Sequence, residues 1–152
     1  MKRIALLGLA CFILVGCGDN SGGKVTNDYL VGEWDCVLKQ YMSKYDYDSE
    51  KYSDYVETDS ISIIQSYKIV NGILFEKLPD QEAKEFDLDK FYNNLKAKYK
   101  THYEEHDMSR SLVKNSNDKF TFENESFSTL QTNQIEPMKL KTKTLRVCTR
   151  IK

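Results

Sequence analysis

Several stretches of the chain alternate between apolar and polar side chains, the pattern typical of a half-buried β-strand. In residues 32–42 (GEWDCVLKQYM), apolar side chains fall mainly on every second position. Residues 60–70 (SISIIQSYKIV) alternate in the same way and are rich in β-branched side chains. Asn71-Gly72, a strong signal for a two-residue hairpin turn, leads into an apolar return over residues 73–76. These features predict antiparallel β structure.

Two later segments extend the predicted sheet. Around residues 112–123, the polar run NSND (residues 115–118) separates two apolar stretches, which indicates a second hairpin. Residues 138–151 alternate again and predict a closing strand.

One amphipathic helix is predicted between the two hairpins. Asp87 is a suitable N-cap, and we expect the helix to run from Leu88 to about Glu104. The side chains that form its apolar stripe are Leu88, Phe91, Tyr92, Leu95, Tyr99 and Tyr103. A length of 152 residues with 30% charged side chains fits a single domain. The predicted fold is therefore mainly β (α+β): an antiparallel sheet or small barrel with one packed amphipathic helix.

The N-terminus has the pattern of a secretory signal. Residues 1–16 (MKRIALLGLACFILVG) place two cations before an apolar run that is too short to cross a bilayer. The run ends in Leu14-Val15-Gly16-Cys17, which resembles the lipobox of bacterial lipoproteins. The resemblance implies cleavage before Cys17, which becomes the first residue of the mature chain and carries fatty acyl groups such as palmitate. Two or three acyl chains make a stable membrane anchor.

The segment after Cys17 is Gly-rich and polar, and we expect residues 17–28 to form the lipidated cysteine and a flexible tether. A single globular β-rich domain would follow over residues 29–152. Residue Gly18 stands where aspartate would favour inner-membrane retention, so the pattern resembles lipoproteins that are exported to the outer membrane. We therefore expect a lipid-anchored protein of the cell envelope, at the outer membrane rather than the inner one.

The four cysteines fit this location. Cys11 would leave with the signal peptide and Cys17 would carry lipid. Cys36 and Cys148 remain as one pair in an exported chain, which predicts a disulfide. The bridge would join the first and last strands and, in the chain-entropy model, stabilise the domain by about 4–5 kcal/mol.

The opening strand carries Gly32-Glu33-Trp34, which resembles the Gly-x-Trp signature of lipocalins and small lipocalin-like bacterial proteins. In that family the tryptophan closes the floor of a barrel, and an arginine from near the chain end packs over it. The resemblance implies that Arg146 or Arg150 takes this position by a cation–π contact. It also implies an alternative function, a carrier of a small apolar ligand inside the barrel.

The two histidines lie in one short segment, His102-Tyr103-Glu104-Glu105-His106, which resembles the H-x-x-E-H pattern of inverzincin metalloproteases. On a helix, His102 and His106 would reach one zinc ion and Glu105 would be the general base. The remaining chain offers no counterpart of the third ligand of those enzymes. We therefore expect a partly buried histidine pair at a helix end and no metal site, with zinc binding by His102 and His106 as an alternative.

An acidic, tyrosine-rich segment follows the first strand. Its carboxylates from Asp46 to Glu57 approach the spacing of a calcium loop, but Lys51 stands where that loop needs glycine. A solvated loop is therefore expected. Its tyrosines supply large contact areas at low entropic cost, and the carboxylates between them would suit a cationic partner. The tyrosines of this candidate binding surface are Tyr41, Tyr45, Tyr47, Tyr52 and Tyr55.

The sequence favours binding over catalysis. A net charge of −1 does not provide the basic surface that nucleic acid needs. No Ser-His-Asp order, phosphate-binding loop or Cys-His pair is found, so we predict no catalytic residue and no cofactor. The expected function is a non-enzymatic binding or interaction module facing the periplasm or cell surface. Its partners would be the membrane, through the lipid on Cys17, and an unidentified protein.

Overall fold

The computed structural model describes residues 23–101, 104–131 and 136–151. Within these ranges, the chain is mainly β, with ten strands in one antiparallel sheet and two short helices. The strands are β1 (Gly23–Lys24), β2 (Gly32–Asp46), β3 (Lys51–Tyr52), β4 (Val56–Val70), β5 (Ile73–Lys77), β6 (Lys84–Glu85), β7 (Lys96–Lys100), β8 (Glu104–Ser116), β9 (Lys119–Leu130) and β10 (Met138–Arg150). The helices are α1 (Asn27–Leu30) and α2 (Leu88–Asn93).

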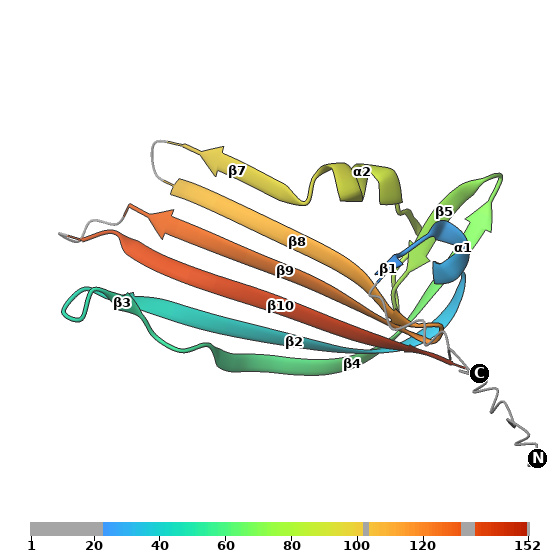
Figure 1. The fold of residues 1–152 in the computed structure, drawn as a ribbon, viewed down its shortest axis with the longest axis horizontal. Helices are drawn as coiled ribbons and strands as arrows, with labels where there is room; N and C mark the ends of the chain where they lie inside the picture. Colours follow the sequence, from blue (N-terminus) through green and yellow to red (C-terminus); the bar gives the residue numbers. More distant parts are fainter. Residues whose placement is uncertain (1–22, 102–103, 132–135, 152) are drawn as a thin grey trace, which may run out of the picture.

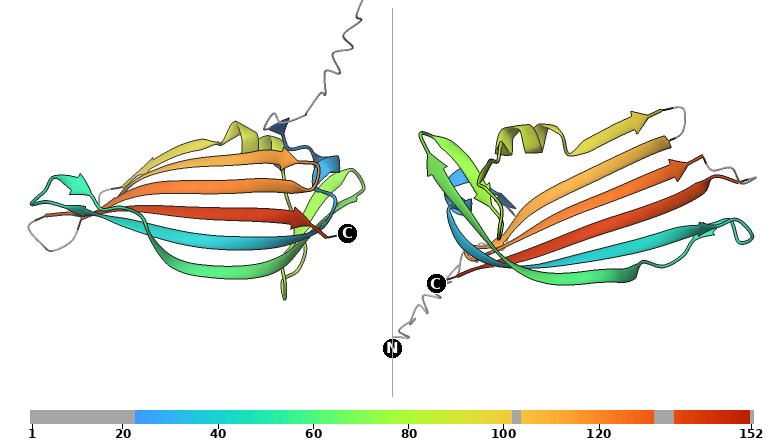
Figure 2. Two further views of the ribbon diagram at one scale, coloured as in Figure 1. Left: turned by 60° about the horizontal axis from the view of Figure 1, so that its bottom comes forward. Right: turned by 180° about the vertical axis from the view of Figure 1, so that it is seen from behind.

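The sheet curls into a half-barrel (Figure 1). Its strand order is β1-β8-β9-β10-β2-β4-β5-β6, with β3 paired to β2 and β7 paired to β8. Both helices and the β4–β5 hairpin gather at one end, which we call the closed end (Figures 1 and 2). The other end, where β2 turns into β3, is called the open end.

The first long strand and the last strand lie side by side. β2 and β10 pair from Leu140 opposite Lys44 to Arg150 opposite Trp34. β4 pairs with β2 on one side, but with β5 only from Ser66 onward. In the part of the chain that the structure describes, the outer edge of β4 before Ser66 therefore has no neighbouring strand.

The hydrophobic core sits at the closed end. Trp34 is fully buried and its ring meets that of Phe120 edge-on, with centroids 4.7 Å apart. The alternation at the start of β2 explains this placement, because Trp34 and Cys36 are buried while Glu33 and Asp35 are exposed. The buried hydrophobic residues are Val25, Leu30, Trp34, Cys36, Tyr67, Leu74, Leu88, Phe91, Leu112, Phe120 and Cys148.

The predicted strands and hairpins are confirmed. The β4–β5 turn falls on Asn71 and Gly72, which have φ of 52° and 82°, the positive values that a tight hairpin of this kind requires. The second hairpin joins β8 to β9, and the closing strand is β10.

The predicted helix is wrong beyond its first turns. Asp87 is the N-cap as expected, since its carboxylate accepts a hydrogen bond from the Lys90 amide at 2.8 Å, but α2 ends at Asn93. Residues 96–100 instead form β7 and pair with β8. Their sequence, KAKYK, also alternates with period two, and pairing with β8 satisfies their backbone groups.

The folded part begins before the predicted position. Gly23 and Lys24 pair with β8, and Val25 is fully buried. The prediction that residues 23–28 belong to a flexible tether is therefore wrong. The predicted signal peptide and Cys17 lie outside the described residues. No helix within the described ranges is long and apolar enough to cross a bilayer.

Candidate functional site

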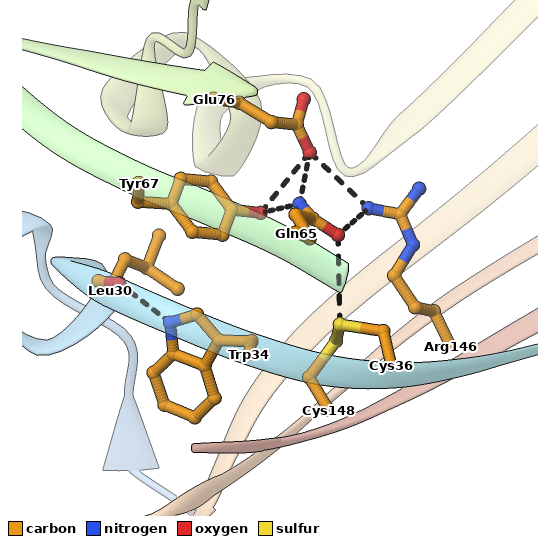
Figure 3. The surroundings of a disulfide bond; sticks show 8 residues. All are labelled: Leu30, Trp34, Cys36, Gln65, Tyr67, Glu76, Arg146 and Cys148. Atoms are coloured by element: carbon orange, nitrogen blue, oxygen red, sulfur yellow. Dashed lines mark hydrogen bonds and ion pairs between the residues drawn. A yellow bond between two sulfur atoms is a disulfide. The ribbon is translucent and has the colours of Figure 1, made fainter. Parts of the chain in front are cut away.

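The predicted disulfide is confirmed. Cys36 in β2 and Cys148 in β10 stand directly opposite each other, with Cα atoms 4.0 Å apart and both side chains fully buried (Figure 3). The alternation of both strands turns these side chains toward the core, so the bridge lies inside the curl of the sheet.

A polar network lies beside the disulfide, centred on the fully buried Gln65 (Figure 3). Its Oε1 accepts a hydrogen bond from Arg146 Nη1 at 3.0 Å, while its Nε2 donates to Glu76 and to the hydroxyl of Tyr67. Arg146 and Glu76 also form an ion pair at 3.3 Å. The amide therefore has a cation on its oxygen side and an anion on its nitrogen side, which fixes its orientation.

Tyr67 is held neutral within this network. Its side chain is buried, and its hydroxyl donates to Glu76 Oε1 at 3.2 Å. Burial raises the pKa of Tyr67, and the negative charge of Glu76 raises it further. Because the phenol keeps its proton, it stays a hydrogen-bond donor to the carboxylate.

A cavity of about 250 Å³ opens next to this network. Its walls are mainly aromatic, and include Phe86 from the loop before α2 and Phe122 from β9. Its charged lining consists of Glu76, Arg110 and Arg146. The guanidinium of Arg146 lies 5.3 Å from the centroid of the Phe122 ring, and its Nε is buried without a hydrogen-bond partner among the described residues. Such a cavity suits a small ligand with an apolar body and a polar group.

Arg150, not Arg146, packs over the tryptophan. Its guanidinium lies 4.2 Å from the centroid of the Trp34 ring, and its Nη1 donates to the Val31 carbonyl at 2.7 Å. Gly32 makes this approach possible: its φ is +127°, and a Cβ there would lie 2.7 Å from Arg150 Nη1. The glycine, tryptophan and arginine thus lie together at the closed end, and Arg150 is one of the two arginines expected over Trp34.

The described part of the histidine segment, residues 104–106, lies in a strand and not in a helix. Glu105 and His106 lie on β8, where Glu105 pairs with Lys100 at 3.3 Å and His106 Nδ1 lies 2.7 Å from Ser128 Oγ. His102 lies outside the described residues. At His106, a strand takes the place of the helix on which the predicted zinc pair depends. Among the residues that the structure describes, no group of three or more His, Cys, Asp or Glu could hold a metal ion.

The acidic, tyrosine-rich segment forms the tip of the open end. Asp46 accepts hydrogen bonds from the Ser49 hydroxyl at 2.7 Å and the Asp48 amide at 3.1 Å, and these bonds lower the pKa of Asp46. The Asp46 carboxylate, the first of the series with calcium-loop spacing, therefore already accepts hydrogen bonds within its own turn.

The tyrosine rings at this tip already have cationic neighbours. Tyr45 contacts Tyr47 and Tyr52 edge-on, at centroid distances of 4.9 and 5.0 Å. Lys139 lies 4.6 Å over the Tyr45 ring, and Lys141 lies 4.3 Å over the Tyr52 ring. Both lysines come from β10, so part of the aromatic surface predicted to meet a cationic partner is covered by the chain's own lysines.

Two features of the structure had no place in the sequence predictions: the charged cavity and the free edge of β4. The cavity joins side chains from β4, β5, β8, β9 and β10, which no local pattern brings together. A comparison with protein families, with curated proteins and with solved structures finds no match.

Proposed function

We propose that this protein is a lipid-anchored, non-enzymatic interaction module of the bacterial cell envelope. The lipobox-like sequence before Cys17 supports the anchoring, and the disulfide fits an oxidising compartment. The observation that carries the interaction is the free outer edge of β4. There, an extended segment of a protein partner would add a strand to the sheet.

The exposed side chains of β4 support this surface. Val56, Ile61 and Ile64 are 63%, 44% and 50% exposed. Ile61 and Ile64 are an odd number of residues apart in the strand, so their side chains project from opposite faces of the sheet. A long edge with exposed β-branched side chains is a template for pairing with another strand.

The opposite edge of the half-barrel is different. The outer residues of β7 include Lys96, Lys98 and Lys100, and exposed lysines are a common protection of sheet edges against pairing. The β7 edge thus carries three lysines, while the β4 edge exposes three β-branched apolar side chains beside Glu57 and Asp59. This contrast favours β4 as the docking edge.

The test of the docking edge is affinity capture from envelope extracts. We expect Ile64→Lys to abolish recovery of a partner that the wild-type protein retains, because a lysine disfavours strand addition. Ile73→Lys is the matched control: Ile73 is 43% exposed but lies on β5. A partner that is recovered equally with Ile64→Lys would contradict the proposed edge.

The anchor is tested separately by metabolic labelling. Radiolabelled palmitate should enter the wild-type chain and not a Cys17→Ser variant. An unlabelled wild-type band would contradict the lipid anchor.

A second candidate function is a carrier of a small ligand. It is favoured by the aromatic cavity of about 250 Å³ at the closed end. Binding of a small apolar compound that shifts the NMR signals of Phe122 and its neighbours would support this function.

A further inference from the structure

We propose that the cavity at the closed end binds a small monoanionic amphiphile, a carboxylate with a short apolar body, and that Arg110 holds its charged group. This inference rests on the second candidate function and names the chemical class of its ligand.

The charges inside the cavity do not balance. Arg146 is paired with Glu76, at 3.3 Å. Arg110 also lines the cavity, but within the described ranges it has no carboxylate partner: Nη2 donates to Met108 Sδ at 3.2 Å. A thioether sulfur is a weak acceptor, so this bond does not compensate the charge of Arg110. The lining of this cavity, called the inner cavity below, thus has two arginines and one glutamate, a net charge of +1. The Arg110 guanidinium also has donors free for a ligand.

The neighbouring surface continues the site outward. Arg110, Phe86 and Phe91 also line a second, wider cavity of about 570 Å³. Its other charged residues are Glu85, Asp87 and Lys90. Asp87 is already used as the N-cap of α2. Arg110 therefore stands where the two cavities meet, so a ligand held there can place its apolar body against the phenylalanine rings.

The size of the inner cavity sets the size of the ligand. A volume of about 250 Å³, at roughly 30 Å³ for each water-sized group, holds about eight non-hydrogen atoms. Hexanoate has this size. Its carboxylate can form a bidentate ion pair with a guanidinium, which the neutral analogue 1-hexanol cannot form. The pair of probes separates recognition of charge from recognition of apolar surface.

The experiment uses the full chain in non-ionic detergent, with its arginine side chains labelled with ¹⁵N for NMR. We expect hexanoate to shift the Nε–H signal of Arg110 and to bind about tenfold more tightly than 1-hexanol. Arg110→Gln should weaken hexanoate binding about tenfold. Binding by this variant is measured from the shifts of the Phe122 signals. All variants are measured in the same micelles, so the ratios of their dissociation constants are independent of partition into detergent.

Two further variants test the role of charge. Glu76→Gln removes the competing carboxylate but keeps a hydrogen-bonding amide, so hexanoate should bind several-fold more tightly. Lys68→Gln is the matched control, since it removes a positive charge from an exposed position of β4, outside the cavity. Hexanoate binding by that variant should equal that of the wild-type protein.

The outcomes separate the two levels of the proposal. Equal binding of hexanoate and 1-hexanol, unaffected by Arg110→Gln, would overturn the anion inference and leave the carrier function in place. Binding of neither probe would overturn both. Weaker binding in Arg110→Gln together with tighter binding in Glu76→Gln would support the inference, because a purely structural effect would not give opposite signs.

Discussion

Gly32 and Arg150 depend on each other at the closed end. The guanidinium of Arg150 covers Trp34 and binds backbone carbonyls of the segment that leads into β2. It can do so only because residue 32 has no Cβ and can adopt a positive φ. The arginine therefore joins the end of the last strand to the start of the first long strand.

We expect Gly32→Ala to lower the free energy of unfolding by about 1–3 kcal/mol, because alanine is strained at positive φ and its Cβ would displace Arg150. Gly72→Ala is the matched control: residue 72 also has a positive φ, but a Cβ there has no atom within 4 Å. Urea denaturation at neutral pH measures both variants. Equal losses would show that the approach of Arg150 contributes nothing.

Tyr67 gives the protein a defined sensitivity to alkali. Its pKa in the folded state is raised above the unfolded value of about 10. The corresponding stability is complete below pH 10 and is lost as the pH rises above it, because the unfolded chain then releases the proton first. Tyr67→Phe should lower the free energy of unfolding by about 1 kcal/mol at neutral pH. Above pH 10, the free energy of unfolding of this variant should fall less steeply than that of the wild-type protein. Urea denaturation over this range measures the slopes, and identical slopes would contradict the role of Tyr67.

Individual residues of the sequence allowed part of the candidate site to be predicted. Two remaining cysteines in a chain expected to be exported predicted the disulfide, and the Gly-x-Trp resemblance offered Arg150 as one of two arginines over Trp34. The Gln65 network could not be predicted. Gln65 occupies a core-facing position of a strand, but its partners Glu76 and Arg146 are brought to it only by the pairing of β4, β5, β2 and β10.

Among the secondary-structure elements, α2 and β7 show why local patterns can mislead. Leu88, Phe91 and Tyr92 follow helical spacing and do form a helix. Leu95 and Tyr99 continue that spacing, yet KAKYK also fits a strand, and its pairing with β8 decides the outcome. Lys98 and Asp107 face each other across this pair at 3.0 Å, and this contact raises the pKa of Lys98. The sequence alone cannot weigh these tertiary contacts against helix propensity.

Tyr92 connects α2 with β1. Its hydroxyl accepts a hydrogen bond from the amide of Val25 at 2.9 Å and lies 3.3 Å from the carbonyl of Leu112 in β8. Val25 is fully buried, so its amide has no access to water as a replacement. This contact explains how a strand of only two residues, β1, holds its place at the end of the sheet.

We expect Tyr92→Phe to lower the free energy of unfolding by about 1–3 kcal/mol, the cost of a buried amide without a partner. Amide hydrogen exchange at Val25 should become faster than in the wild-type protein. Tyr99→Phe is the control, because Tyr99 is 58% exposed. Unchanged exchange at Val25 would contradict the connection through Tyr92.

Across the whole molecule, the disulfide links residues 112 positions apart in the sequence. The loop that it closes includes β4 to β9, so the bridge restricts the unfolded chain over most of the domain. The mainly β, antiparallel architecture was predictable, because alternation and turn signals are local. The curl and the free edge of β4 were not, because they follow from which strands lack neighbours.

Replacing both cysteines, Cys36→Ala with Cys148→Ala, should lower the free energy of unfolding by about 2–5 kcal/mol. Urea denaturation of this variant and of the wild-type protein measures the difference. Reduced wild-type protein is the control, because it keeps both cysteine side chains but lacks the bridge. A double variant with unchanged stability would show that pairing of β2 with β10 alone restricts the chain.

The described chain starts and ends at the closed end, so both of its ends lie far from the open end (Figure 1). β2 has 15 residues, and at roughly 3.3 Å per residue its far end lies about 50 Å from its start. If the N-terminus is attached to a membrane, the tyrosine-rich open end lies at the far end of the sheet from the attachment point. This end would then contact a partner about one strand length from that point.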